Sequence, residues 1–213
     1  MLCFLLSRGF WLLLLRPCLS WEARVLEVAS VGSMVAQFGA SVEGKFFAFG
    51  GKDAGSCKKA WKFDDDGWSE VASMPLPSYV KSLSGCGAAS SVAMGKIFLS
   101  GCFVAYEEEN DEEKKIYASN LTFAYEYRND SWLRLADLPE PLAGSGLAVV
   151  NEEIHLVGGA SHLSENAIFK EETSTLLRDS YAHYVYADNE WKHLSKLNVA
   201  RNRLSLVLHD GSL

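Results

Sequence analysis

The chain has 213 residues and is 48% hydrophobic, which fits one ordinary domain with enough apolar side chains for a core. The net charge of −7, with no Lys/Arg cluster larger than a pair, argues against a nucleic-acid-binding face, because such a face needs a basic patch. Aromatic residues are plentiful, which favours β structure.

The first 23 residues differ from the rest of the chain. An apolar core, Gly9 to Leu15, is followed by the break Arg16-Pro17 and by small residues before Trp21. This pattern resembles a secretory signal peptide cleaved after Ser20 or Ala23, although Arg16 is unfavourable there. The alternatives are an untargeted apolar N-terminal strand or a wrongly chosen start codon. We therefore expect a leader over residues 1–23 and a secreted protein, with a cytoplasmic protein as the alternative.

No segment of the chain is expected to span a membrane. The apolar run near the N-terminus is shorter than the ~20 residues of a spanning helix, and charges interrupt every later apolar run.

From residue 34 onward, short alternating strands and turns recur in three units. The first unit has expected strands at 34–42, 45–49, 61–63 and 68–71, with turns at 43–44 and 64–67. The second has strands at 87–93, 96–99, 122–127 and 132–135, with turns at 94–95 and 128–131. The third has strands at 147–150, 153–157, 181–186 and 191–194, with turns at 151–152 and 188–189. A strand at 204–208 would begin a fourth unit.

The three units share the same landmarks. The first strand pair of each ends at glycine, the second contains a tryptophan, and in two units a Met-Pro or Leu-Pro exit follows. These landmarks are Gly50-Gly51, Trp68 and Met74-Pro75, then Gly101, Trp132 and Leu138-Pro139, then Gly158, Gly159, Trp191 and Leu197. Trp21 falls where the closing tryptophan of an earlier unit would lie. Repeats near 50 residues with four strands each are typical of a β-propeller.

The pattern resembles the kelch repeat. The resemblance implies an all-β fold: a kelch-type β-propeller segment over residues 24–213, with repeats at 34–77, 85–141 and 144–197 and the start of a fourth at 203–213. It departs from the family at Ser100, which replaces the first glycine of a pair, and in its exit arginine, which is found only as Arg201 or Arg203.

The number of repeats is low for this family. Kelch propellers usually close with about five to seven blades, and an open arc would leave exposed blade faces. We therefore expect either a fragment of a longer protein or self-association through open blade edges.

The resemblance also implies where a partner binds. In a four-stranded meander with strands a to d, the b–c and d–a connections share one side, and in families of this fold that side commonly receives peptide partners. The long connections 102–121 and 160–180 are both of the b–c type, and loops of that length are usually functional or disordered. The candidates on this side are Tyr79, Lys81, Glu107, Glu108, Glu109, Asp111, Glu112, Glu113, Ser161 to Thr173 and Arg201. The alternative for the acidic run is a solvated, mobile loop.

No catalytic, metal or cofactor site emerges from the sequence. Asp64-Asp65-Asp66-Gly67 lacks the alternating ligands of a calcium loop, and the histidines lack metal-ligand spacing. The alternative is a carbohydrate-active enzyme of the same fold, a copper-dependent sugar oxidase or a sialic-acid isomerase. Tyr125, Tyr181, Cys102 and His183 supply the required side-chain types, but no spacing assembles them. We therefore expect a non-catalytic protein-binding scaffold.

The cysteines leave two interpretations open. With Met94-Gly95 as a turn, Ala93 pairs with Lys96, so Cys86 lies opposite Phe103 and Cys102 lies opposite Gly87. The two sulfurs would then lie on adjacent strands, one position out of register. An oxidising compartment would allow a Cys86–Cys102 disulfide, and the alternative is two buried thiols.

Two sequons agree with a secreted glycoprotein. They place possible glycosylation at Asn120 and Asn129.

Overall fold

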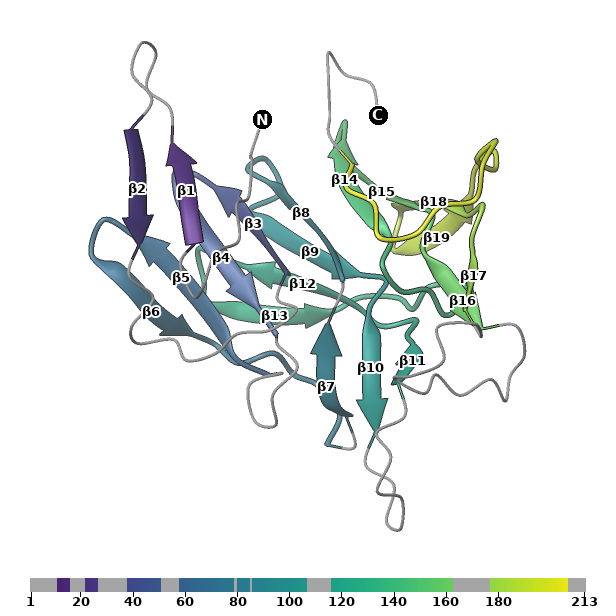
Figure 1. Cartoon of the computed structure of the whole chain (residues 1–213), viewed down its shortest axis with the longest axis horizontal. Coiled ribbons are helices and arrows are strands. Elements are labelled where there is room, and N and C mark those ends of the chain that lie inside the picture. Colours follow the sequence, from purple (N-terminus) through teal and green to yellow (C-terminus); the bar gives the residue numbers. More distant parts are fainter. Residues whose placement is uncertain are drawn as a thin grey trace. The chain divides into compact units, whose positions relative to one another are not determined.

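The structure is a computed structural model that describes residues 11–15, 22–26, 38–50, 58–78, 80–84, 86–106, 116–162 and 177–206 (Figure 1). Every regular element in these ranges is a β-strand, as expected for an all-β fold. None of the described segments is a helix long and apolar enough to cross a membrane. Residues 1–34 and 35–213 form two separate compact units.

The first unit contains one hairpin. Strand β1 (Trp11–Leu15) pairs antiparallel with β2 (Glu22–Leu26), with Trp11 opposite Leu26. An apolar N-terminal strand is one of the two alternatives to a leader. Cleavage after Ser20 or Ala23 stays a prediction, and Trp21 lies outside the described residues.

The second unit contains three four-stranded antiparallel sheets, each a meander in chain order, as the sequence predicts (Figure 1). Blade 1 consists of β3 (Phe38–Val42), β4 (Lys45–Phe49), β5 (Ala60–Asp64) and β6 (Gly67–Val71). Blade 2 consists of β8 (Gly87–Ser91), β9 (Lys96–Ser100), β12 (Thr122–Glu126) and β13 (Ser131–Arg134). Blade 3 consists of β14 (Gly146–Val150), β15 (Glu153–Val157), β18 (His183–Ala187) and β19 (Glu190–His193). The first strands of consecutive blades are neighbours, β3 beside β8 and β8 beside β14.

Three predicted two-residue turns are confirmed, at 43–44, 151–152 and 188–189. All their residues have positive φ, for example 50° at Glu43 and 75° at Gly44. Such turns twist in the same sense as the strands that they join, so they fix the register of each hairpin.

The predicted turn at Met94-Gly95 is wrong. Ser91 pairs with Lys96, so the turn has four residues, 92–95. It is closed by the Gly95 N–H, which donates to the Val92 carbonyl at 3.1 Å, and by the Ser91 hydroxyl, which accepts from the Met94 N–H. The predicted register therefore shifts by two residues: Gly87 lies opposite Ser100 rather than Cys102.

Smaller corrections concern element boundaries. In blade 2 the second turn spans 127–130, because Glu126 pairs with Ser131. In blade 1, Asp64 pairs with Gly67, which leaves a two-residue turn. Strand β18 begins at His183, two residues later than predicted. Residues 204–206 do not form the predicted strand of a fourth unit, and 207 and 208 lie outside the described residues.

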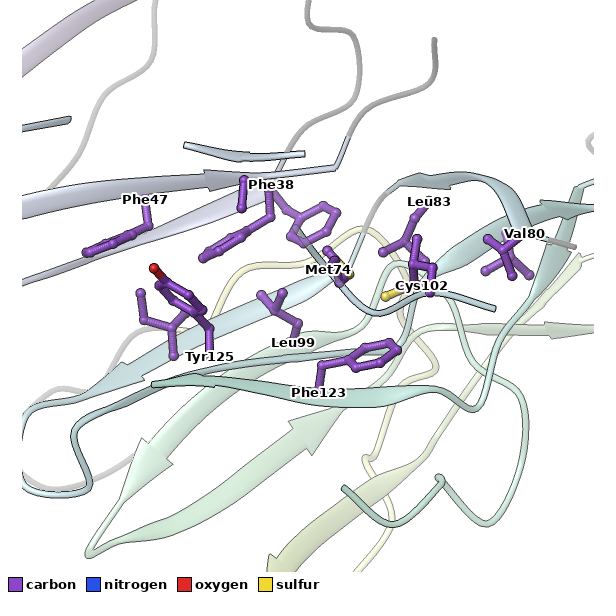
Figure 2. Packing of buried hydrophobic residues seen from close by; sticks show 14 of the residues in the cluster. Phe38, Phe47, Met74, Val80, Leu83, Leu99, Cys102, Phe123 and Tyr125 are labelled. Atoms are coloured by element: carbon purple, nitrogen blue, oxygen red, sulfur yellow. The ribbon is translucent and has the colours of Figure 1, made fainter. Parts of the chain in front are cut away.

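In blades 2 and 3, the tryptophan of the outer strand lies on the face that packs on the preceding blade. Between blades 1 and 2, Phe47 and Phe49 of β4 lie against Tyr125 and Trp132. Figure 2 shows Phe47 and Tyr125 in this core. We call this contact the first joint. Burial of each such ring contributes roughly 1.5–3 kcal/mol.

The second joint, between blades 2 and 3, has a core of smaller side chains. Its buried members are Ala89, Phe98, Ala124, Leu138, Leu142, Leu147, Ile154, Leu156, Ala182 and Tyr184. Blade 2 thus buries both of its faces, because successive residues of a strand point to opposite sides.

Candidate functional site

The connections predicted to be loops carry a second layer of β structure. Strand β10 (Phe103–Tyr106) continues from β9 and pairs on one side with β11 (Ile116–Ala118) and on the other with β7 (Val80–Ser84). In the next connection, β16 (Ala160–His162) pairs with β17 (Leu177–Asp179). Strand β11 lies beside β16. We call these five strands the connection platform.

The prediction of plain loops at 102–121 and 160–180 is therefore wrong in part. Apolar residues flank the charged run of the first connection, and Leu83 and Val104 are fully buried there. The same core continues from the first joint into the platform. The signal was present in the continuous apolar run from Phe103 to Tyr106, but the acidic run that follows drew attention away from it.

Glycines mark the point where each b strand leaves its blade. Gly50, Gly101 and Gly158 all have φ near +65°, a conformation that glycine adopts without steric cost. A Cβ on Gly101 would lie 2.7 Å from the Ser145 hydroxyl oxygen of the next blade. Each of these three glycines therefore lies at a bend between a blade and the connection that follows it.

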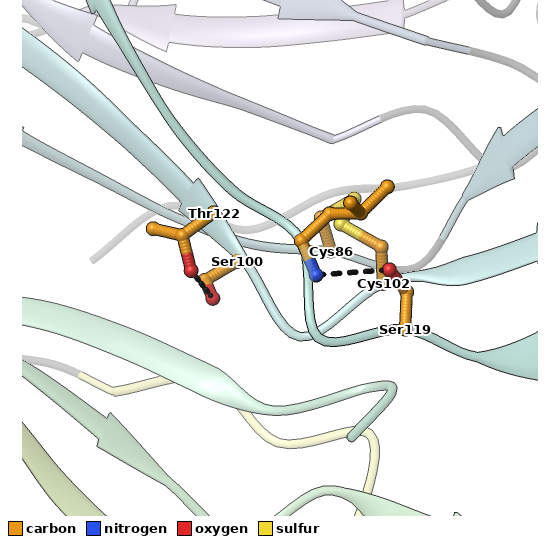
Figure 3. Close-up of a disulfide and its surroundings, with 6 residues drawn as sticks. Cys86, Ser100, Cys102, Ser119 and Thr122 are labelled. Carbon is orange, nitrogen blue, oxygen red and sulfur yellow. Dashed lines mark hydrogen bonds between the residues drawn. A yellow bond between two sulfur atoms is a disulfide. The ribbon is translucent and has the colours of Figure 1, made fainter. Parts of the chain in front are cut away.

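A disulfide joins Cys86 and Cys102 at the border between blade 2 and the platform (Figure 3), which is one of the two interpretations that the sequence leaves open. Cys86 precedes β8 and Cys102 precedes β10, so the bond ties the d–a connection to the b–c connection. Their redox state in the cell stays a prediction.

Backbone hydrogen bonds hold the third strand of the platform at the same border. The Ser119 N–H donates to the Cys102 carbonyl at 2.9 Å. The Ser119 hydroxyl accepts from the Leu121 N–H at 3.0 Å (Figure 3). The buried hydroxyls of Ser100 and Thr122 bond to each other at 2.9 Å. Buried polar groups at the bend are thus satisfied, as a stable bend requires.

The predicted binding residues are only partly covered by the described ranges. Lys81 lies in β7, and Ser161 lies in β16. Arg201 is exposed, and its backbone bridges to Ser180 while its carbonyl accepts from the Gly159 N–H at 2.8 Å. Gly51, Tyr79, Glu107, Glu108, Glu109, Asp111, Glu112, Glu113 and 163–173 lie outside the described residues. Binding through these side chains stays a prediction.

The sequence reasoning missed a hydrogen-bonded clamp in the first joint. The peptide group of Ala72, just after β6, is held on both sides: its N–H donates to the Asp130 carboxylate and its carbonyl accepts from the Trp132 indole, both at 2.7 Å. Asp130 also accepts from the Tyr125 hydroxyl at 2.7 Å. Burial, and then this bond to a carboxylate, raise the pKa of Tyr125 well above its ordinary value.

The second joint repeats half of this clamp. The Trp191 indole donates to the Ala136 carbonyl at 3.1 Å, and the Tyr184 hydroxyl donates to the Glu140 carboxylate at 2.8 Å. The buried Trp68 indole of blade 1 has no hydrogen-bond partner among the residues that the structure describes.

The side chains considered for an enzyme are engaged separately. The Tyr125 hydroxyl bonds to Asp130, Cys102 is in the disulfide, His183 contacts His155, and Tyr181 is exposed. Asp64, from the acidic turn, forms an ion pair with Lys62 at 2.7 Å. Within the described ranges, no group of three or more His, Cys, Asp or Glu residues could hold a metal ion.

The two sequons differ in exposure. Asn129 is exposed in the turn 127–130, whereas Asn120 is half-buried and its sequon residue Thr122 is fully buried. Glycosylation at either site stays a prediction.

Comparison with known proteins gives two related sequences. No family model matches the chain. Beta-scruin of Limulus polyphemus is 29% identical over 164 residues, which cover 75% of this chain and 16% of beta-scruin. Alpha-scruin of the same organism is 28% identical over 128 residues, 58% of this chain and 13% of alpha-scruin. The chain thus spans a small part of the length of these relatives.

Among solved structures, that of YjhT aligns with 92% of this chain and 80% of its own chain, at 13% identity and a TM-score of 0.43. The three blades have the strand order and landmarks that the repeat pattern predicts. The similarity to the two scruins is at a low level of sequence identity.

Proposed function

We propose that the chain is a non-catalytic protein-binding scaffold that receives its partner on the side of the connection platform. The observation that carries this proposal is the pairing of β7 with β10, because it joins the d–a and b–c connections into one sheet. The Cys86–Cys102 disulfide and the Ser119 bonds attach this sheet to blade 2. A platform held in this way loses little conformational entropy on binding.

The negative charge of one connection favours a partner with a basic surface. The connection between β10 and β11 contains Glu107, Glu108, Glu109, Asp111, Glu112 and Glu113, followed by two lysines. Acidic groups at the tip of a connection would steer a basic partner toward the platform and would oppose acidic ones.

The test replaces the tip of the connection and measures binding. Residues 107–113 are exchanged for a Gly/Ser segment of equal length, and proteins captured by the immobilised chain are compared with those captured by the variant. The dissociation constant is then measured for each recovered partner. We expect the exchange to weaken binding by about tenfold or more, which corresponds to ~1.4 kcal/mol.

The matched control lies on the opposite side of the blades. Replacing Asn151-Glu152 in the a–b turn by Asn-Gly keeps a favourable turn, so it should leave partner binding unchanged. Unchanged binding after exchange of both 107–113 and 163–176 would contradict the proposal.

We further propose that the chain folds in an oxidising compartment of the secretory pathway. The disulfide and the exposed sequon at Asn129 support this proposal. Protein secreted from eukaryotic cells should start after residue 20 or 23 and should lose mass on glycosidase treatment. Free alkylation of both Cys86 and Cys102 without reductant would contradict it.

A further inference from the structure

Two histidine rings meet on the face of blade 3 that is turned away from blade 2. His155 on β15 and His183 on β18 lie diagonally across the strand pair, since His155 is opposite Val185 and Val157 is opposite His183. The Nδ1 atom of His155 lies 3.1 Å from the Nε2 atom of His183. Both rings are half-buried.

The groups around the pair draw the ring protons away from this contact. The Glu153 carboxylate lies 4.0 Å from Nε2 of His155, which favours a proton on that nitrogen. The backbone of Ser195 hydrogen-bonds to the His183 ring. This bond favours the ring proton of His183 on the nitrogen that faces Ser195, away from His155.

When each ring carries its proton on the outward-facing nitrogen, the two facing nitrogens present lone pairs to each other. With a proton on one of these nitrogens, the two rings share a hydrogen bond of 3.1 Å; with a proton on neither, the two lone pairs repel unless a cation lies between them. Outward N–H groups that bond to a carboxylate or a backbone carbonyl are also the arrangement that orients metal-binding histidines.

The separation of the two nitrogens fits a shared metal ion. Two metal–nitrogen bonds of about 2.05 Å that enclose an angle of about 100° place the nitrogens about 3.1 Å apart. That angle lies between square-planar and tetrahedral coordination, and imidazole suits Cu²⁺, Ni²⁺ and Zn²⁺.

We propose that His155 Nδ1 and His183 Nε2 together bind one divalent transition-metal ion, with water in the remaining coordination positions. The described residues offer no third protein ligand at this place, so the site is a two-nitrogen site of moderate affinity. Selectivity should follow the general order for nitrogen ligands, with Cu²⁺ bound more tightly than Ni²⁺ or Zn²⁺.

The test is metal titration of the full chain by calorimetry at pH 7.5, after its free thiols have been alkylated. NiCl₂ and ZnCl₂ are the probes, and Cu²⁺ is used for electron paramagnetic resonance. We expect one ion per chain, with two nitrogen ligands in the Cu²⁺ spectrum. His155→Gln and His183→Gln should each weaken binding by about tenfold or more, and Glu153→Gln should weaken it less.

The matched control is His193→Gln, because His193 is exposed on the opposite face of the blade. There the centroid of its ring lies 4.2 Å from the centroid of the Tyr184 ring. This variant should bind metal like the unmodified chain. Equal binding by the unmodified chain and both pair variants would overturn the proposal. So would an absence of binding together with nitrogen NMR signals that show a proton shared between the two rings.

Discussion

The two joints between blades have a similar arrangement of tryptophan and tyrosine hydrogen bonds, but they differ in how many aromatic rings pack in the core. In the first joint, the rings of Phe47 and Phe49 pack against Tyr125 and Trp132, with Phe49 and Trp132 centroids 5.4 Å apart. In the second joint, aliphatic side chains such as Ile154 and Leu156 replace most of these rings. Aromatic pairs add about 0.5–1.5 kcal/mol beyond the area that they bury, so the first joint should be the more stable.

Turn length explains the difference in hydrogen bonding. The four-residue turn 127–130 of blade 2 carries Asp130 far enough to reach the Ala72 N–H of blade 1. The turn 188–189 of blade 3 has two residues, and its Asn189 accepts from Tyr186 within the same blade. The two additional residues in the turn of blade 2 thus allow a contact with the neighbouring blade that the shorter turn of blade 3 does not make.

The largest expected effect comes from the cores. Phe49→Ala should lower the free energy of unfolding by about 3–5 kcal/mol, because it removes a fully buried ring that packs on four aromatic neighbours. Leu156→Ala in the second joint should cost about 2–4 kcal/mol. Urea denaturation of both variants checks the order, and a larger loss from Leu156→Ala would reverse the comparison of the joints.

The disulfide lies beside the core of the first joint, at the border between blade 2 and the platform, and no cysteine follows position 102 to do the same near the second joint. Reduction should lower stability by about 3 kcal/mol, the loss expected for a loop of about 15 residues in the chain-entropy description. Thermal unfolding with and without reductant measures the total loss of stability. Hydrogen exchange then shows where stability is lost: amides of β8, β9 and β10 should exchange faster, whereas those of β15 and β18 should change little. Equal acceleration in blade 3 would show that the joints unfold as one unit.

The sequence was sufficient for the blades because each strand pair has its own turn and landmark. Glu43-Gly44 and Asn151-Glu152 specify two-residue turns directly, and the glycines and tryptophans repeat in phase. The turn before Lys96 could not be predicted in the same way, because a two-residue turn and a four-residue turn both end at Gly95.

Local sequence patterns could not predict the contacts between segments that are distant in the chain. The pairing of β7 with β10 depends on how the exit of blade 1 meets blade 2, and the hydrogen bond between Asp130 and Ala72 joins residues 58 positions apart. Likewise, His155 and His183 are 28 positions apart, and only the strand register brings their rings together.

The clamp in the first joint should have an intermediate effect. Asp130→Ala leaves the Ala72 N–H and the Tyr125 hydroxyl without their acceptor, so it should lower the free energy of unfolding by about 1–3 kcal/mol. The counterpart Asn189→Ala removes one exposed hydrogen bond to Tyr186 and should cost about 1 kcal/mol or less. Urea denaturation compares the two, and equal losses would mean that Asp130 acts only within its own blade.

The smallest effect is expected at an ion pair across the first joint, where Arg128 contacts the Glu43 carboxylate in the turn of blade 1. Both side chains are well exposed, and solvent screening makes such pairs contribute little. The bond to Arg128 lowers the pKa of Glu43. Its stabilising contribution is therefore fully present above the ordinary pKa of a glutamate and is lost as the pH falls through the lowered value, because the unfolded chain binds the proton more readily.

Melting temperatures of Glu43→Gln and the unmodified chain should consequently differ slightly at pH 7 in low salt and coincide at about 1 M salt, where the screening length is about 3 Å. They should also converge at low pH, once the carboxyl is protonated in both states. A large difference that persists in high salt would show that Glu43 stabilises the first joint through packing of its turn rather than through charge, and would add the turn of blade 1 to the contacts that distinguish the two joints.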